Sequence, residues 1–256
     1  MATRPYVLSE TTWKTIKSTK YEVALLPWGA TEAHNYHLPY GTDIIETDRI
    51  GREVVRLAAT RGARVILLPT VPFGVNTGQL KIPLTINMNP STQMAVLNDV
   101  LTSLEHHNIP RLAILNGHGG NDFRQMIREL SLRHKTFLAS VNWYRSVPLK
   151  DFFDAPGDHA DEMETSLMMF LAPELVLPLS EAGKGEEHRL RIPAFREGWA
   201  WTPRDWRRVT SDTGTGNPKA ATAAKGSRYF TAVTEKIADF LLDLARTDPE
   251  DLYDKG

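Results

Sequence analysis

The stretch YEVALLPWGATEAHNYHLPYGTD, residues 21–43, decides the fold class of this chain. It opens with a continuous apolar run, Tyr21–Pro27, and then becomes a polar loop rich in histidine and carboxylate side chains. A strand that is apolar at consecutive positions is typical of a parallel sheet whose two faces are both covered by helices. The stretch therefore predicts a central strand of such a sheet, with a polar loop at its carboxyl end.

On both sides of this stretch, short apolar runs alternate with longer amphipathic ones. The predicted strands are Glu22–Leu26, Arg64–Leu68, Leu112–Leu115 and Phe137–Val141. Helical periodicity predicts helices at about 44–61, 91–107, 122–134, 161–171 and 219–246. The order βαβαβα predicts an α/β layer fold with a largely parallel sheet. At 256 residues and with no linker-like stretch, the chain is expected to form one domain, residues 1–256.

Two prolines mark expected helix starts, Pro90 and Pro218, because proline is tolerated in the first helical turn. Residues 178–218 are rich in Pro, Gly, Trp and charge, and they form the least regular segment. We expect long loops there that could cover a pocket. Within them, GWAWTPRDW at 198–206 is either a cluster that packs the loop or an aromatic wall of a pocket, since buried tryptophans serve both purposes.

The composition excludes several classes of protein. A net charge of −1 and a pI near 6.7 give no electrostatic footprint for nucleic acid or an anionic membrane, so we expect a small-molecule substrate as partner. The absence of cysteine excludes disulfides and thiolate sites, and any metal must be held by His, Asp and Glu. The first ten residues lack the apolar core of a signal peptide, and no stretch approaches the roughly 18 apolar residues of a membrane span. A cytoplasmic location is expected.

Potential metal ligands lie in three polar motifs that follow or precede the predicted elements. The motifs are PWGATEAHNYHLPYGTD at 27–43 with Glu32, His34 and Asp43, NGHGGND at 116–122 with His118, and GDHADEMETS at 157–166 with Glu164. In open α/β sheets, sites form at the carboxyl ends of the strands, where the first two motifs lie. Clustered carboxylate and imidazole donors are what a catalytic divalent metal needs. The motifs therefore predict a metal-dependent hydrolase.

The residues of the first motif also have structural interpretations. Taken alone, Glu32 is expected to be a solvated loop acid, because acidic side chains are mostly exposed. Asp43 is equally well explained as the N-cap of the helix over 44–61. His37 is expected to have a structural role or to support a ligand rather than to be one.

The third motif opens the helix predicted from Asp161. On that helix Glu164 shares a stripe with Leu167, Met168 and Leu171, which places it toward the buried side, where an unpaired carboxylate is costly. Asp161 and Glu162 lie farther from the stripe and are expected to be solvated.

These motifs, in this order, resemble the creatininase family, the creatinine amidohydrolases and their relatives. The resemblance continues through VPFGVNTGQLKIPLTINMNP at 71–90 and TGTGNPKAATAAKG at 213–226, so that it covers nearly the whole chain. The E-x-H sequence followed nine residues later by Asp, with NGH and ETS downstream, carries its specificity.

The resemblance implies a three-layer α/β/α sandwich with a mainly parallel sheet and a homo-oligomer, commonly a hexamer. It also implies two divalent metal ions per chain, Zn, Mn or Fe. By matching position, Glu32 and His118 would bind one ion, His34 the other, and Asp43 would bridge them. Glu164 would be the remaining ligand. His159, which matches the histidine of the family's third motif, would be the catalytic acid and base.

The chain also departs from creatininase proper. There the NGH motif continues with a tyrosine and a metal-binding glutamate, whereas Gly119 and Gly120 stand in those places here. Creatinine is therefore not the expected substrate. The glycine version resembles other branches, which include formamidopyrimidine nucleotide deformylases, a peptide-trimming enzyme and inosose-ring hydrolases. The aromatic pair Trp143 and Tyr144 resembles the family's substrate-contacting region.

The function predicted from these residues is a metal-dependent hydrolase, an amidohydrolase that acts on a cyclic amide or formamide-type small molecule through a metal-bridging hydroxide. A histidine such as His159 would then deliver the proton to the departing nitrogen. The alternatives are ring cleavage of a cyclic polyol ketone at the same site, or a metal-binding homologue without turnover. The chain has no G-x-S-x-G and no Walker glycine loop with lysine, which disfavours a serine nucleophile and NTP hydrolysis.

Overall fold

The computed structural model describes residues 4–254. Within this range, one sheet has the strand order β2-β1-β3-β4, and all its neighbours are parallel. The strands are β1 Val23–Trp28, β2 Val65–Leu67, β3 Arg111–Asn116 and β4 Phe137–Asn142. Strands β1 and β3 pair in register from Val23 with Arg111 to Trp28 with Asn116, so both end at the same edge. The predicted parallel α/β sheet is confirmed.

Helices connect the strands as the sequence pattern predicts. The longer ones are α2 Thr42–Thr60, α3 Pro90–His106, α4 Arg124–Leu130, α5 Glu162–Leu171 and α8 Ala223–Arg246. The short helices are α1 Trp13–Ile16, α6 Pro193–Glu197 and α7 Trp206–Val209. The 3-10 turns are η1 Leu8–Glu10, η2 Thr77–Gln79, η3 Trp143–Arg145, η4 Leu149–Asp151, η5 Pro173–Leu175 and η6 Pro218–Ala220.

The two prolines expected at helix starts behave differently. Pro90 opens α3 as predicted. Pro218 opens only the 3-10 turn η6, and α8 begins at Ala223 rather than near 219. The later start has a local cause, because the hydroxyl of Thr222 accepts a hydrogen bond from the backbone N–H of Lys225 and caps the helix there.

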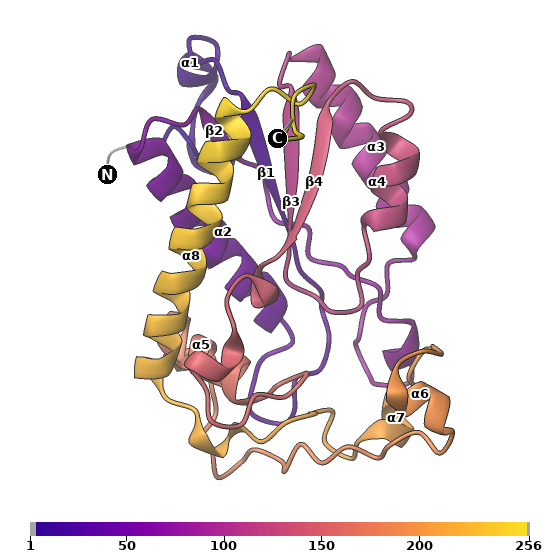
Figure 1. Cartoon of the computed structure of the whole chain (residues 1–256). Helices are drawn as coiled ribbons and strands as arrows, with labels where there is room; N and C mark the ends of the chain where they lie inside the picture. The colour runs from indigo at the N-terminus through magenta and orange to yellow at the C-terminus, as the bar shows by residue number, and fades with distance from the viewer. Residues whose placement is uncertain (1–3, 255–256) are drawn as a thin grey trace.

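Helices cover both faces of the sheet, which gives three layers (Figure 1). Residues such as Val23 and Leu25 point to the face covered by α2, α5 and α8, and the intervening Ala24 and Leu26 point to the face covered by α3 and α4. This alternation follows from the two-residue period of a strand. Because both faces are buried, every residue of β1 is apolar and buried, and the expected three-layer sandwich is confirmed.

The amino-terminal end of α8 packs closely against α5. A Cβ added to Gly226 would lie 2.0 Å from the carbonyl oxygen of Ser166, so only glycine allows this approach. The expectation that Asp161 and Glu162 are solvated is wrong, since both are buried. Asp161 caps α5 through the N–H groups of Met163 and Glu164. Glu162 accepts a hydrogen bond from the N–H of Ala155 and forms an ion pair with Lys225 of α8.

Residues 178–218 form long loops with the short helices α6 and α7, as the sequence predicts. Figure 1 shows them running beyond the carboxyl-terminal edge of the sheet. They are attached to the loop after β1, because the side chain of Asn35 accepts a hydrogen bond from the N–H of Gly183 at 2.8 Å. The backbone N–H of Asn35 donates to the hydroxyl of Thr213 at 2.9 Å. The segment is thus positioned near the polar motifs.

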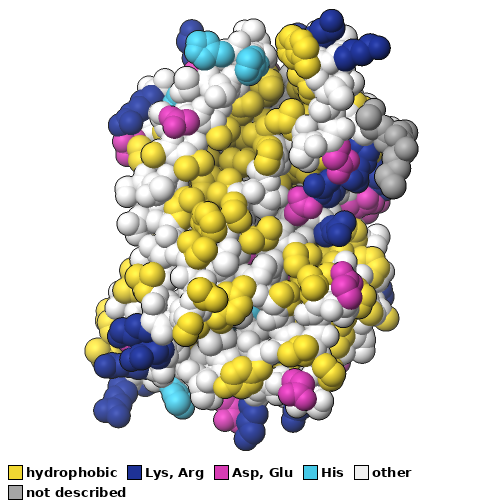
Figure 2. Space-filling view, turned by 180° about the vertical axis from the view of Figure 1, so that it is seen from behind, with side chains coloured by type: hydrophobic (Ala, Val, Ile, Leu, Met, Phe, Trp, Pro, Cys, Tyr) yellow, Lys and Arg dark blue, Asp and Glu magenta, His cyan; other side chains and the backbone are white. Residues whose placement is uncertain are grey.

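Apolar side chains remain on the surface. Figure 2 shows them gathered over a broad part of the rear face, between charged groups at either end. Among the described residues, the most exposed large apolar side chains include Leu84, Leu132 and Trp201. None of the helices within residues 4–254 combines the length and the hydropathy needed to cross a bilayer.

Candidate metal centre

The three polar motifs meet in one buried cluster beyond the carboxyl ends of β1 and β3. Glu32 and His34 follow β1, Asp43 lies in the first turn of α2, and His118 follows β3. His159 and Glu164 reach the same place from the start of α5. All six side chains are buried. The parallel register of β1 and β3 explains this convergence, since both strands deliver their following loops to one edge.

The carboxylate of Asp43 lies between two imidazoles. Its Oδ1 is 2.9 Å from Nε2 of His34, and its Oδ2 is 3.0 Å from Nδ1 of His118. The same Nδ1 of His118 lies 2.9 Å from Oε1 of Glu32. On the other side, Oε1 of Glu164 is 3.9 Å from Nε2 of His34. Asp43 is therefore the one carboxylate in contact with both histidines.

Each of the three imidazoles is held from behind by a backbone carbonyl. Nδ1 of His34 lies 3.1 Å from the carbonyl oxygen of Glu32, and Nε2 of His118 lies 3.1 Å from that of Val75. Nε2 of His159 lies 2.9 Å from the carbonyl oxygen of Ala33. A carbonyl only accepts, so these ring nitrogens carry the hydrogen and donate. The opposite nitrogen of each ring, with its lone pair, is left facing the carboxylates, as in metal-binding histidines.

The donor set fits divalent metal ions. Glu32, Asp43 and His118 bring one nitrogen and two oxygens within 4.8 Å of one another, and so do His34, Asp43 and Glu164. Oδ2 of Asp43 is buried and has no hydrogen-bond partner among the described residues, although His118 is next to it. Two imidazole lone pairs facing carboxylates repel unless a proton or a cation lies between them. Nitrogen and oxygen donors of this kind suit Zn or Mn.

The raised pKa values of His34 and His118 show that the carboxylates of the cluster favour positive charge beside them. Burial opposes protonation of His34, but the adjacent Asp43 carboxylate and then Glu164 and Glu32 raise its pKa to about 10. The pKa of His118 is likewise raised well above its usual value by Glu32 and Asp43, against the effect of burial. Without metal, protons therefore occupy positions that cations would take, and metal binding must release them.

His159 is placed differently from the other two histidines. Its Nδ1 is 3.8 Å from Oε1 of Glu32, and its ring centroid is 4.2 Å from that of His34. Burial and then the positive charge of His34 lower its pKa. Together with Glu32 and His34 it forms a third group of possible ligands. Its geometry allows either a proton-transfer role or a ligand role.

Position 120 cannot supply a side chain to this centre. A Cβ on Gly120 would lie 2.3 Å from the carbonyl oxygen of Val75 and 2.5 Å from Nε2 of His118. Glu164 approaches instead from α5, where its Oε2 accepts a hydrogen bond from the N–H of Ala160. Burial raises the pKa of Glu164 to about 8, with His34 acting in the opposite direction. A buried carboxyl with this pKa is one that a cation would stabilise in its ionised form.

The structure decides between the alternative interpretations of Asp43, His37 and Glu32. The helix-cap interpretation of Asp43 is wrong, because Gly41 is the N-cap of α2 and Asp43 turns toward the histidines. His37, expected to have a structural or a supporting role, makes a structural contact, with Nε2 2.8 Å from the hydroxyl of Thr165 on α5. The solvated interpretation of Glu32 is also wrong, since its side chain is buried.

Of the two aromatic residues expected at the substrate, Trp143 does not line an open surface. Trp143 is 1% exposed and packs in the core, where its indole N–H donates to the hydroxyl of Thr47 at 3.1 Å. A ring this deeply buried leaves no face for a substrate. Tyr144 is half-buried beside Trp143, with ring centroids 5.8 Å apart. The register of this region explains the difference, because β4 ends at Asn142 and η3 turns Trp143 inward.

Sequence reasoning missed three residues near the centre. Gln79 donates from Nε2 to Oε2 of Glu32. Glu46, one turn after Asp43 on α2, is buried, and neither carboxylate oxygen has a hydrogen-bond partner among residues 4–254. Trp206 contacts the His159 ring at a centroid distance of 4.8 Å. The spacing of Glu46 from Asp43 was a usable signal, whereas Gln79 and Trp206 arrive on loops distant in sequence.

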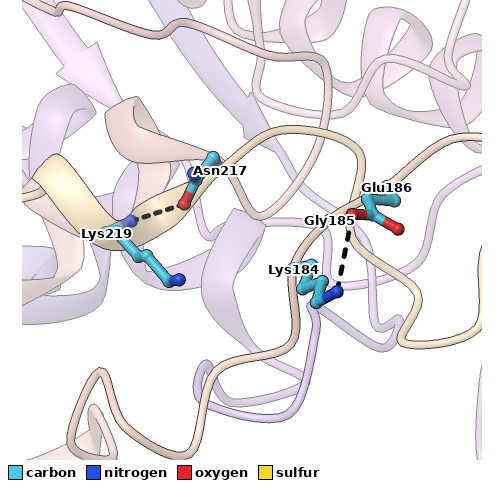
Figure 3. A pocket seen from close by; sticks show the side chains of 5 residues that line it. All are labelled: Lys184, Gly185, Glu186, Asn217 and Lys219. Atoms are coloured by element: carbon cyan, nitrogen blue, oxygen red, sulfur yellow. Dashed lines mark hydrogen bonds and ion pairs between the residues drawn. The ribbon is translucent and has the colours of Figure 1, made fainter.

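A separate hollow of about 460 Å³ lies outside this cluster (Figure 3). It is lined by Lys184, Gly185, Glu186, Asn217 and Lys219. Its charged side chains are exposed, and Lys184 is already 3.8 Å from Glu186. No histidine or buried carboxylate lines it. The chemistry of the chain is therefore better placed at the buried cluster than in this hollow.

The fold and the site are those of an α/β protein with a buried group of possible metal ligands, and the comparisons show its family. A family model described as "Creatininase: Creatinine amidohydrolase" matches residues 9–241. The chain belongs to the creatininase family, whose members are metal-dependent hydrolases.

Two curated relatives match over most of their length. A mycofactocin precursor peptide peptidase of Mycobacterium ulcerans (strain Agy99) is 28% identical over 88% of this chain and 85% of the relative. A creatinine amidohydrolase of Pseudomonas putida is 25% identical over 91% of this chain and 94% of its own. These two relatives are named for different activities, a peptidase and an amidohydrolase.

Solved structures agree with the fold. A putative creatinine amidohydrolase from Bacteroides fragilis NCTC 9343 is 45% identical, covers 99% of this chain and 100% of its own, and has a TM-score of 0.91. A mutant creatininase of the Zn–Zn type and a manganese form of creatininase each cover 94% of this chain and 99% of their own, with TM-scores of 0.77 and 0.76. Both are 22% identical, which shows the shared fold.

Proposed function

We propose that this protein is an amidohydrolase that cleaves a C–N bond in a cyclic amide or formamide-type small molecule at a centre for two divalent metal ions. One observation carries the proposal. Three buried imidazoles each donate one N–H to a backbone carbonyl and direct the other nitrogen at a group of carboxylates. The peptidase and amidohydrolase relatives both support C–N cleavage.

The residues divide into two sets that share Asp43. Glu32 and His118 with Asp43 would hold one ion, and His34 and Glu164 with Asp43 would hold the other. The Zn and Mn forms of the structural neighbours support these metals, and Fe remains a further candidate. When bound, such ions lower the pKa of water and polarise a carbonyl oxygen.

The chain's own residues would handle the protons. His159 keeps its Nε2–H on the carbonyl of Ala33, so Nδ1 is the nitrogen free to take a proton and pass it to the departing nitrogen. Its lowered pKa keeps the ring neutral and able to accept near neutral pH. Gln79 holds Oε2 of Glu32 and fixes the orientation of that carboxylate. Exclusion of water by the buried walls strengthens each of these interactions.

A substrate panel on zinc- and manganese-loaded protein tests the proposal. It should include cyclic amides, N-formyl compounds, short peptides and a cyclic polyol ketone, with the metal-depleted protein as control. We expect metal-dependent release of a carboxylate and an amine from an amide member. Turnover of the ring ketone alone would favour the alternative of ring cleavage. No turnover with full metal content would favour a metal-binding homologue.

A homo-oligomer and a cytoplasmic location remain predictions. The apolar side chains gathered on the rear face in Figure 2 support assembly, because large exposed apolar patches usually mark protein contacts. Light scattering at micromolar concentration would test this, and a monomeric mass would count against it.

A further inference from the structure

The segment at 204–206 contacts two successive residues, Asp158 and the catalytic candidate His159. The indole of Trp206 meets the His159 imidazole in an edge-to-face arrangement, with centroids 4.8 Å apart and an interplanar angle of 63°. One residue earlier, Asp158 forms an ion pair with Arg204, with Nη1 and Oδ2 2.6 Å apart. The guanidinium of Arg204 also lies over the Trp206 ring, 4.7 Å from its centroid. Arg204 thus links the indole to the carboxylate of Asp158, the residue before His159.

The same segment is anchored to the loop that holds Glu32. A Cβ on Gly78 would lie 2.0 Å from the carbonyl oxygen of Arg204, so the two backbones are in direct contact. Lys81 forms an ion pair with Asp205 at 3.1 Å. Gly78 belongs to the turn η2, which also carries Gln79, the partner of Glu32. The indole of Trp206 is therefore fixed relative to the metal centre.

The other restraints on His159 act on its backbone, on its Nε2 atom and on its ring, whose centroid lies 4.2 Å from that of His34. Its N–H and C=O bond to the backbone of Thr215 at 3.1 and 2.8 Å. Its Nε2 bonds to the carbonyl of Ala33. The second torsion of a histidine is broad and roughly two-fold, so a half turn of the ring would exchange Nδ1 for a carbon. A ring packed between His34 and Trp206 cannot make this turn unless one of these two neighbours moves, and Trp206 is the one that is not a proposed metal ligand.

We propose that Trp206 is a positioning residue that holds the His159 ring with Nδ1 directed at the reacting centre, and that Arg204 holds Trp206 in turn. This role rests on the proposed function of His159. In the GWAWTPRDW stretch, Trp206 would then form a wall of the site, whereas Trp201 lies on the surface and is 83% exposed. The two tryptophans thus provide a test residue and a matched control on one segment.

The first readout is kinetic and compares Trp206→Ala, Trp206→Phe and Trp201→Ala in the zinc-loaded protein. Trp206→Ala should lower kcat by roughly 2- to 10-fold, the equivalent of one edge-to-face ring contact, while KM and metal content stay as in the wild type. Phenylalanine keeps an aromatic edge and should restore most of the loss. Trp201→Ala should match the wild type. Arg204→Met should fall between the wild type and Trp206→Ala.

The second readout does not depend on turnover. The His159 ring resonances, assigned by their absence from His159→Ala, should shift and broaden in Trp206→Ala and stay unchanged in Trp201→Ala. Unchanged ring resonances together with unchanged kcat in a folded Trp206→Ala protein would overturn the inference. So would a loss of metal that accounts for the whole fall in kcat. If the wild type turns over no amide while the ring resonances still respond to Trp206, the proposed reaction fails and the positioning role stands.

Discussion

Replacing Asp43 by alanine tests the centre at the point shared by both sets of ligands. Each set contains three residues, and Asp43 is common to the two, so the substitution leaves two donors in each. Glu164→Ala shortens only one set. Loss of a supporting residue outside the ligand set already weakens metal binding about 10- to 100-fold, and loss of a shared ligand should exceed this for both ions. We therefore expect bound zinc to fall from about two per chain toward zero in Asp43→Ala and toward one in Glu164→Ala.

The stability of the fold provides a second measure of the same loss. A ligand at 100 times its Kd stabilises the native state by about 2.7 kcal/mol. For a chain of this size, that is a rise in Tm of roughly 5–10 °C. The wild type should show this rise on adding zinc, and Asp43→Ala should show almost none. Elemental analysis after dialysis and thermal melts with and without zinc measure both effects. Two zinc ions retained in Asp43→Ala, or an undiminished rise in Tm, would refute the shared-ligand role.

Three further predictions concern the acid, the protons and the glycines. His159→Ala should keep its metal and lose about 10²- to 10⁴-fold in kcat, whereas Glu164→Ala should lose both metal and activity. If metal analysis finds that His159→Ala loses metal and Glu164→Ala keeps it, the two roles are reversed. Because the pKa of His34 is raised from 6.5 to about 10, the metal-free protein keeps that proton throughout this range and must release it to bind zinc. Zinc affinity should therefore rise by up to about tenfold per pH unit between pH 6.5 and about 10 and level off above that, and a flat profile in competition titrations would contradict the proton-for-cation argument. Gly120→Ala should lower the free energy of unfolding in urea by about 1–3 kcal/mol, since its Cβ would lie 2.3 Å from the carbonyl oxygen of Val75. Gly119→Ala, with open space at its Cβ, is the control and should stay within about 0.5 kcal/mol of the wild type.

The sheet and the convergence of the polar motifs after β1 and β3 could be predicted because they depend on local pattern, whereas the assignment of five residues as metal ligands came from the family resemblance and stays a prediction. A continuous apolar run such as that in β1 identifies a strand covered on both faces, and the polar residues directly after it must lie at the carboxyl edge. The burial of Glu162 could not be predicted in this way. Helical periodicity placed it away from the apolar stripe, but its partner Lys225 stands 63 residues later in the chain, so that only the packing of α8 on α5 brings them together.

The contacts made by loops could not be predicted either, because their partners are also distant in the sequence. Gln79 contacts Glu32 from 47 residues farther along the chain, and Trp206 contacts His159 from the first turn of the short helix α7, within a segment that is mostly loop. The stretch GWAWTPRDW had two interpretations, and no spacing rule separates a tryptophan at a site from one at the surface. The structure separates Trp206, which is half-buried against a histidine, from the exposed Trp201.

The least predictable feature of the centre is also the one that decides its chemistry. The ring nitrogens that donate are fixed by the carbonyl oxygens of Glu32, Ala33 and Val75, and every residue type has a carbonyl. The sequence therefore shows which histidines are present but not which of their nitrogens face the carboxylates. That choice follows from the backbone path of the loops after β1 and before α3, and it decides whether each ring directs a lone pair or a hydrogen at a cation. It also explains the difference between the histidines. The nitrogens of His34 and His118 that face Asp43 lie 2.9 and 3.0 Å from its carboxylate oxygens. Nδ1 of His159 lies farther from its nearest carboxylate, 3.8 Å from Oε1 of Glu32, and this distance leaves it free to transfer a proton.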